Sequence, residues 1–279
     1  MSCPRVSHGA SALRPGPLAW CASRVAATFP RMENATSFGE QADAYATGRP
    51  AYPANLFQWI AEQTPCRDLV WDVGTGSGQA ALSLVTHFAH VHATDIDKNQ
   101  LSRAPRHPHI AFSVAPAQAS GLAPNSVDAI TVATALHWFD HGLFWDEIRR
   151  VARRDALFCA WTYHRAETDA EVQRCLIDPI VETVAPYRSD GNRLSWRGYS
   201  PEDLNMPFEV IRSPSFTCDL IWTPMQIAGF LKTWSSYRRA RMAGHDRRLA
   251  EIERAALAEL GDECRVYKLP LNMLAARVN

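Results

Sequence analysis

A glycine-rich turn, WDVGTGSGQAALSLV at residues 71–85, has the spacing that points most directly to chemistry. Three glycines alternate with small polar residues, and Asp72 stands two residues before the first of them. Such a turn can bind the pyrophosphate of a dinucleotide on bare backbone amides, or it can bind a ligand without a phosphate. GSGQAA, read from Gly76, fits the dinucleotide pattern G-x-G-x-x-A, whereas the pattern read from Gly74 fails at Gln79.

The acid before the turn favours the ligand without a phosphate. A buried carboxylate at Asp72 would repel a pyrophosphate, but it can accept charge-assisted hydrogen bonds from an ammonium group, each worth on the order of 1.5–3 kcal/mol. Asp95 ends the next strand-like segment, where a carboxylate can accept from both hydroxyls of a ribose. The two acids favour a positively charged nucleoside, and an NAD-linked oxidoreductase that uses GSGQAA is the rival enzyme class.

Strand-like and helical segments alternate around these acids, with short connections. This order is typical of an α/β fold with a doubly wound, mostly parallel sheet, in which ligands bind beyond the carboxyl ends of the strands. We therefore expect Asp72, Gly76, Asp95, Ala117 and His137 to converge on one crevice. The expected strands of this region are 68–73, 90–95, 109–114, 126–135 and 155–163.

The alternation stops after residue 163. Residues 165–186 are expected to be helical and 187–205 to form a loop, and together they suggest a lid. Beyond the lid, we expect strands, a mostly helical stretch and a last strand that closes a seven-stranded sheet. The predicted domain, 32–279, then has three parts: a cofactor-binding core (32–163), a helical lid insertion (164–205), and C-terminal strands and helices (206–279).

Composition excludes several classes of function. The 279 residues are 47% hydrophobic, enough for one large domain. Lys plus Arg and Asp plus Glu are equal at 29 each, which argues against a nucleic-acid binder. No apolar run approaches the roughly 20 residues that cross a membrane. The seven cysteines form no C-x-x-C pair, so we expect a cytoplasmic protein with reduced thiols and no metal site.

The first 31 residues differ in composition from the rest, with four arginines and no acidic residue. They suit a transit-like peptide, a disordered tail, or an extension upstream of a true start at Met32. We favour the last two interpretations and leave this segment out of the fold.

Several segments together resemble the class I S-adenosylmethionine-dependent methyltransferases: DVGTGSGQ, ATDID, AQASGLAPNSVDAITVATALHWFD and KTWSSY. FGEQADAYATGRPAYP is further similar to the small-molecule branch that includes trans-aconitate methyltransferase. The resemblance runs from about Phe38 to the C-terminus and is strongest over 69–140. It implies a Rossmann-like methyltransferase fold, S-adenosylmethionine as cofactor, and a small molecule as methyl acceptor.

The resemblance also implies roles by position. Asp95 would hold the ribose and Ile96 would pack on the adenine, while Arg49 would pair with the cofactor's carboxylate. Pro116 stands where many relatives carry an acid, which puts recognition of adenine by that side chain in doubt. The positions implied to contact the cofactor are Tyr45, Arg49, Asp72, Gly74, Thr75, Gly76, Asp95, Ile96, Ala117 and Gln118.

The acceptor side is less specific. His137 follows the fourth strand and suits a base if the acceptor is a hydroxyl or an amine, but an ionised carboxylate needs none. Aromatic residues can line the acceptor pocket, with core packing an equal interpretation: Trp138, Trp161, Trp234 and Tyr237. Two groups of arginines, 149, 150, 153 and 154, and 238, 239 and 241, are interpreted mainly as solvated helix faces. The alternative is that one arginine of the second group, or Arg193 or Arg197 in the lid, binds a carboxylate of the acceptor.

The sequence and this resemblance therefore predict methyl transfer to a small molecule, at an oxygen of a carboxylate or a hydroxyl, with a nitrogen as the alternative acceptor atom. The predicted partners include no nucleic acid and no membrane, and the expected state is a monomer or a weak homodimer. Two rival functions stay open, the NAD-linked oxidoreductase and a non-catalytic partner protein that kept the cofactor site and lost the acceptor site.

Overall fold

The computed structural model describes residues 49–279, and within them an eight-stranded mixed sheet has the order β3-β2-β1-β4-β5-β8-β6, with β7 paired to β8. Strands β1 to β5 are parallel, and β8 runs antiparallel to β5, β6 and β7. The strands are β1 (Leu69–Val73), β2 (His90–Asp95), β3 (Ile110–Val114), β4 (Val127–Ala133), β5 (Ala152–Tyr163), β6 (Glu209–Val210), β7 (Phe216–Trp222) and β8 (Arg265–Val278).

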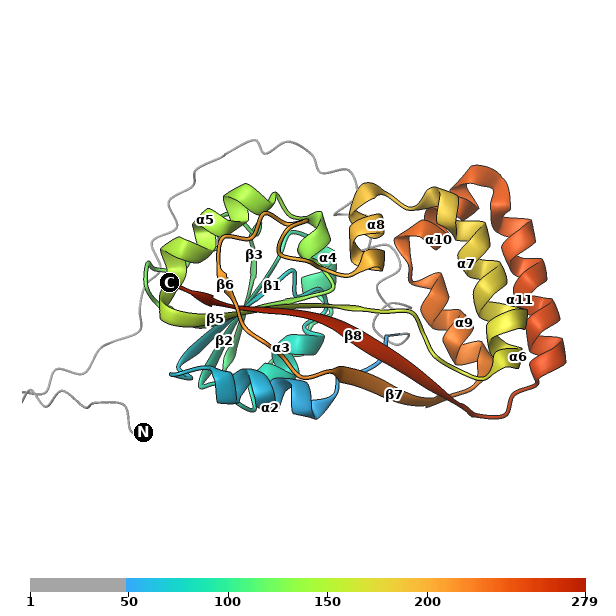
Figure 1. Ribbon diagram of the computed structural model, residues 1–279, viewed down its shortest axis with the longest axis horizontal. Helices are drawn as coiled ribbons and strands as arrows, with labels where there is room; N and C mark the ends of the chain where they lie inside the picture. The colour runs from blue at the N-terminus through green and yellow to red at the C-terminus, as the bar shows by residue number, and fades with distance from the viewer. Residues whose placement is uncertain (1–48) are drawn as a thin grey trace, which may run out of the picture.

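Helices cover both faces of this sheet (Figure 1). On one face lie α2 (Ala54–Gln63) and α3 (Gln79–Leu84), and on the other lies α5 (His141–Val151). Asp140 caps α5 by accepting from the Leu143 amide at 3.2 Å. The buried Phe144, Ile148 and Val151 recur at helical spacing and pack against the sheet, so α5 follows its apolar stripe as the sequence predicts.

A second group of helices stands at one end of the sheet, reached by the long β7–β8 ribbon (Figure 1). Val172 and Ile180 from the first half of this group share one buried core with Leu249 and Ile252 from the second half. Within residues 49–279, no helix is long and apolar enough to cross a bilayer. The group comprises α6 (Ala170–Val172), α7 (Asp178–Val184), α9 (Pro224–Lys232), α10 (Ser235–Ala240) and α11 (Asp246–Leu260), while α8 (Asp190–Arg197) lies between it and the sheet core.

The predicted α/β doubly wound fold is confirmed, with two corrections. The sheet has one strand more than the seven expected, because the two-residue β6 pairs with β8 at Glu209 and Val210. The stretch expected as a loop, 187–205, contains helix α8, which Ser189 caps by accepting from the Asn192 amide at 3.2 Å. A polar sequence with a capping residue forms a helix here because its apolar side chains Leu194 and Trp196 each pack against a buried cluster of the core. Residues 1–48, including the segment set apart by composition, lie outside the described part.

The parallel strands bring distant residues to one edge. Asp72 of β1 is in register with Ala93 of β2 and with Thr131 of β4. Asp95 ends β2, and His137 lies in the short helix η2 (Leu136–Trp138) that follows β4. The expected convergence at the carboxyl ends of β1, β2 and β4 is therefore what the sheet produces.

Candidate active site

A cavity of about 450 Å³ lies at this edge, between the strand ends and the helical group. Its volume is in the range of small-molecule sites. Of the residues expected at the site, the cavity is lined by Arg49, Gly74, Gly76, Asp95, Ile96, Ala117, Gln118, His137, Trp138 and Trp234. Tyr45 lies outside the described residues, and the remaining four, Asp72, Thr75, Trp161 and Tyr237, do not line the cavity.

Asp72 is fully buried behind the glycine turn. Its Oδ2 accepts from the Thr75 hydroxyl at 2.5 Å and its Oδ1 accepts from the Thr131 hydroxyl at 2.8 Å. Burial raises the pKa of this carboxyl to about 6, although the two hydroxyls act in the opposite direction. Asp72 and Thr75 thus form the support of the turn, and the predicted direct contact of Asp72 with the cofactor stays a prediction.

Asp95 lines the cavity and fixes the turn at the same time. Its Oδ2 accepts from the Gly76 amide and its Oδ1 from the Asp97 amide, both at 2.8 Å. Burial raises the pKa of Asp95, and the two amides partly oppose that rise. The carboxylate is therefore held in one orientation, with its remaining lone pairs available to hydroxyl donors.

The amides of the glycine turn are already used inside the protein. Gly76 donates to Asp95, the Thr75 amide donates to the Thr94 carbonyl at 3.0 Å, and the Gly78 amide donates to the Thr75 carbonyl at 3.0 Å. A pyrophosphate needs such amides free. The turn therefore does not suit the dinucleotide that the NAD-linked alternative requires.

The same turn fits a nucleoside. Asp97 lines the cavity next to Asp95, and its Oδ2 is buried without a hydrogen-bond partner among the described residues. A buried carboxylate oxygen normally accepts a hydrogen bond, and a ribose hydroxyl can donate one here. Gly76 has a φ of +58°, and a Cβ built there would meet only Gln100 at 4.0 Å, so the backbone borders open cavity space.

The loop after β3 carries the two residues expected near adenine, Ala117 and Gln118. Glu147 of α5 holds this loop, because its Oε1 accepts from the Ser120 amide at 2.8 Å and from the Ser120 hydroxyl. Glu147 also pairs with Arg150 at 2.7 Å. Sequence reasoning missed this support, since nothing local links residue 147 to a loop 27 positions earlier.

His137 is half-buried and neutral at physiological pH. Desolvation, together with the positive charge of Arg49 and the neighbouring His141, lowers its pKa to about 3. Its Nδ1 shares a hydrogen bond of 2.8 Å with the hydroxyl of Tyr199, whose own pKa burial raises. An imidazole with so low a pKa is a weak base, so its expected role as a base has no support from its surroundings.

Two of the expected aromatic residues belong to the core. Trp161 is fully buried, and its ring meets those of Tyr52 and Phe57 edge to face at 5.4 and 6.1 Å. Tyr237 of α10 is 4% exposed and packs in the same apolar core. Both residues therefore pack in the core, which was the alternative interpretation of each. Trp138 and Trp234, in contrast, line the cavity.

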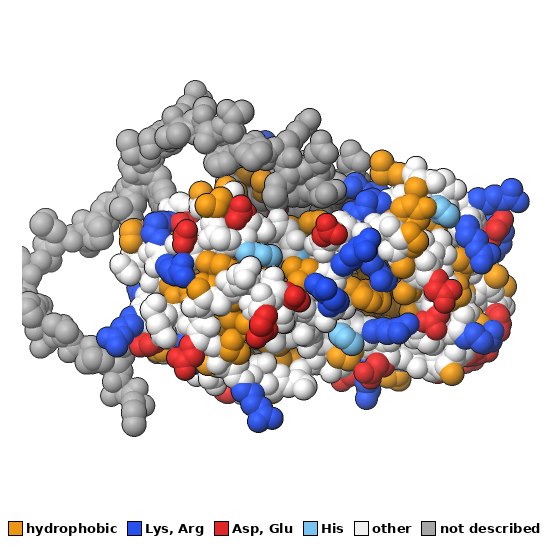
Figure 2. Space-filling model, turned by 45° about the horizontal axis from the view of Figure 1, so that its top comes forward, with side chains coloured by type: hydrophobic (Ala, Val, Ile, Leu, Met, Phe, Trp, Pro, Cys, Tyr) orange, Lys and Arg blue, Asp and Glu red, His pale blue; other side chains and the backbone are white. Residues whose placement is uncertain are grey.

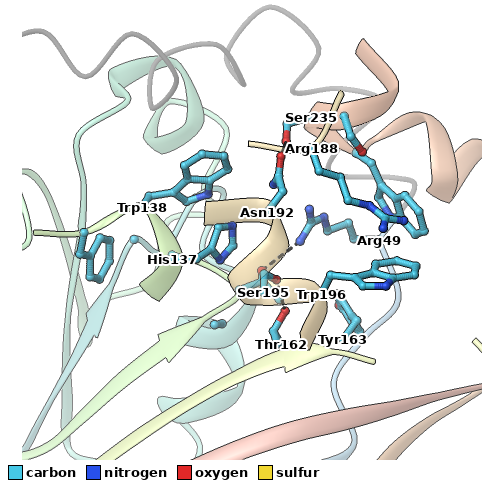
Figure 3. Close-up of a pocket in the computed structure, with 18 of the residues that line it drawn as sticks. Arg49, His137, Trp138, Thr162, Tyr163, Arg188, Asn192, Ser195, Trp196 and Ser235 are labelled. Atoms are coloured by element: carbon cyan, nitrogen blue, oxygen red, sulfur yellow. Dashed lines mark hydrogen bonds between the residues drawn. The ribbon is translucent and has the colours of Figure 1, made fainter. Parts of the chain in front are cut away.

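The far wall of the cavity comes from residues that the sequence did not single out. Figure 3 shows His137 and Trp138 on one side, Arg188 and Trp196 on the other, and Arg49 between them. The Nη1 of Arg49 donates to the Thr134 hydroxyl at 3.0 Å. Gly191 allows this wall to approach η2, because a Cβ there would lie 2.5 Å from the His137 carbonyl oxygen. The capping residue Ser189 was the one local signal that a helix stands here.

Comparisons with known proteins agree with this site. A family model described as a methyltransferase domain matches residues 71–160. A solved structure from Anaeromyxobacter dehalogenans, provisionally assigned as a type II methyltransferase, is 37% identical with a TM-score of 0.75, and the match covers 82% of this chain and 98% of that one.

Two relatives from eukaryotes are also similar. A provisionally assigned methyltransferase of Dictyostelium discoideum is 28% identical over 233 residues, 79% of this chain and 84% of its own. A Saccharomyces cerevisiae protein, provisionally assigned as S-adenosylmethionine-dependent, is 26% identical over 227 residues, 69% of this chain and 78% of its own. The narrower likeness to the trans-aconitate branch stays a prediction. The strand-end acids, the glycine turn and these relatives together show that the chain belongs to the class I S-adenosylmethionine-dependent methyltransferases.

Proposed function

We propose that this methyltransferase acts on a small molecule and methylates one of its oxygens inside the cavity described above. The observation that carries the proposal is the continuity of that cavity, which runs from Gly76 and Asp95 at the strand ends to Trp196 and Trp234 of the helical wall. One enclosed space therefore serves the nucleoside and the acceptor, as a direct transfer between them requires.

The residues at the strand ends suit S-adenosylmethionine. Asp95, with Asp97 beside it, would accept from the ribose hydroxyls, the backbone at Gly74 and Gly76 would border the methionine end, and Ile96 would cover the adenine. When bound, the cofactor supplies an electrophilic methyl group on a sulfonium sulfur, and transfer of that group to an oxygen leaves a neutral thioether.

The protein's part is to align the acceptor and to exclude water. Orientation of this kind contributes roughly 7–11 kcal/mol in favourable cases. The low pKa of His137 bears on the acceptor's chemistry, since a hydroxyl must lose a proton as it is methylated and a weak base assists that poorly. A carboxylate is already ionised at neutral pH, which favours it over a hydroxyl.

A screen of acceptors tests the proposal. The protein would be incubated with S-adenosylmethionine and panels of carboxylic acids, phenols, alcohols and amines, with production of S-adenosylhomocysteine as the signal and mass spectrometry locating the methyl group. We expect methyl esters from acids. Methylation confined to nitrogen would overturn the oxygen target, and binding of S-adenosylhomocysteine with no turnover on any panel would favour the non-catalytic partner protein.

A further inference from the structure

Arg188 lines the cavity and carries a buried donor that has no acceptor among the described residues. It lies between the short helix η4 (Ala185–Tyr187) and α8, and it lines the cavity. Its guanidinium carbon stands 3.9 Å from the ring centroid of Trp196 (Figure 3). Among residues 49–279, no group accepts a hydrogen bond from its buried Nη2. Buried donors are normally satisfied, so this atom marks a place for a ligand.

The neighbouring arginines are already engaged. Arg165 pairs with Asp178 at 3.1 Å, and the Nε of Arg239 donates to the Tyr187 carbonyl at 2.7 Å. Arg193 stands 4.0 Å from Asp190 and is largely exposed. Of the arginines that the sequence suggested as carboxylate binders, Arg239 therefore supports the backbone and Arg193 lies at the surface. Arg188, in contrast, faces the cavity.

The charges around Arg188 favour an anion. Burial lowers the pKa of its guanidinium, and the positive charges of Arg165 and Arg193 lower it further. Figure 2 shows Lys and Arg side chains gathering between the sheet half and the helical half of the molecule. An anion bound there would offset the repulsion and would satisfy the free donor.

The backbone that carries Arg188 is held on both sides. Arg239 donates a hydrogen bond to the carbonyl of Tyr187, the residue before Arg188, and Ser189, the residue after Arg188, caps α8. The Oδ1 of Asn192 accepts from Ser235 at 3.0 Å and from Arg239, which ties α8 to α10. The guanidinium is therefore placed before any ligand arrives, which lowers the entropy that binding must lose.

Apolar side chains also line the cavity near Arg188. The rings of Trp196 and Trp234 meet at 5.7 Å, and Phe230, Leu231 and Val181 also line this part of the cavity. A ligand that fits here combines one anionic group with an apolar body. The planar fork of a guanidinium matches a carboxylate in particular.

We propose that Arg188 is the residue that selects the methyl acceptor, by binding a carboxylate of an apolar organic acid whose body packs along Trp196 and Trp234. This inference rests on the proposed function only in taking the ligand to be the acceptor. The carboxylate held by Arg188 lies across the cavity from His137 and Trp138, on the side away from the strand ends (Figure 3), so the oxygen that is methylated belongs to a second carboxylate or hydroxyl at the other end of the acid.

Matched acid and amide probes test the role of Arg188. Binding of 4-phenylbutanoate and decanoate, of their primary amides and of the corresponding alkylphosphonates would be measured by calorimetry, with and without S-adenosylhomocysteine. We expect each acid to bind about tenfold more tightly than its amide. In Arg188→Gln this preference should disappear while the affinity for S-adenosylhomocysteine stays the same, and Arg188→Lys should keep a part of it.

Arg197→Gln is the matched control, because Arg197 ends the helix α8 that follows Arg188, is exposed, and pairs with Asp203 at 3.6 Å. It should keep the full preference for acids. If Arg188→Gln does not fold, a reduced preference for acids in Arg188→Lys decides the question. Equal binding of acid and amide by the unchanged protein, no binding of any acid, or tighter binding of the phosphonates would overturn the proposal. Failure of S-adenosylhomocysteine to bind would instead count against the proposed function, since the probe series without it still reports on Arg188.

Discussion

The two ends of the cavity are built on different principles. At the strand ends, carboxylates and backbone amides satisfy one another, as Asp95 does with Gly76 and Asp97. At the helical end, short helices bring a guanidinium and aromatic rings together, and within residues 49–279 the buried Nη2 of Arg188 has no acceptor. The first end is fixed by the register of a sheet and suits a constant ligand. The second depends on individual side chains, so we expect it to determine which acceptor binds.

The largest expected effect comes from Asp95→Ala. The variant loses the acceptor of the Gly76 amide and, on the proposed assignment, two hydrogen bonds to ribose, so the Kd for S-adenosylhomocysteine should rise about 100-fold or more. Calorimetry measures the Kd, and Asp146→Ala, on the exposed side of α5, is the control. A Kd within twofold of the unchanged protein would show that the strand end does not hold the ribose, and the contrast between the two ends would fail.

Gly191→Ala tests the contact between the two ends. Alanine normally stabilises a helix relative to glycine, by up to about 1 kcal/mol. Here its Cβ would lie 2.5 Å from the His137 carbonyl oxygen, and this overpacking should destabilise the protein by about 1–3 kcal/mol. Thermal unfolding measures the change. Gly229→Ala is the matched control, since nothing lies within 4 Å of the Cβ it would add to α9. Equal melting temperatures for the two variants would mean that α8 does not pack tightly on η2.

The last expected effect, which develops only in acid, is the pH dependence of stability due to His137. Its folded pKa of about 3 lies below the ordinary 6.5, so its contribution is complete above pH 6.5 and is lost as the pH falls towards 3, because the unfolded chain then binds the proton. Asp72 acts in the opposite sense: its pKa is raised to about 6, so its contribution is present below pH 3.8 and lost as the pH rises through 6.

The variant His137→Gln separates the two contributions. Between pH 6 and 4, its free energy of unfolding should fall less steeply than that of the unchanged protein, by about 1.4 kcal/mol per pH unit. Urea denaturation at several pH values measures these slopes. His90→Gln, at an exposed position, should match the unchanged protein. Parallel slopes for His137→Gln and the unchanged protein would mean that His137 is not held neutral.

The end built by the sheet could largely be predicted, and the end built by the helices could not. Alternating strands and glycines predicted where Asp95 and His137 would meet, because parallel strands end at one edge. The contact of Asp72 with Thr131 of β4 could not be predicted, because only the register of the sheet reveals it. Trp161 is of a residue type that often lines pockets, yet its ring packs against α2 through Phe57.

The helical wall depends on contacts far apart in sequence. Arg188 is one arginine among many, and its free donor becomes apparent only when Arg239 and Arg165 are seen with partners of their own. No local sequence pattern distinguishes an arginine that forms hydrogen bonds within the protein from one that faces a ligand. The short η4 and α8 carry few apolar residues, so periodicity gave little sign of them.

The carboxylate of Asp95 accepts a hydrogen bond from the Gly76 amide. The protein therefore supplies its own anion in the loop where many nucleotide-binding proteins bind a phosphate. Nucleoside triphosphates and inorganic phosphate, which a cell contains in large excess over most metabolites, thus meet a negative charge and occupied donors at this loop. Discrimination against such abundant competitors is then a property of the resting protein, and it needs neither a moving part nor a second binding event.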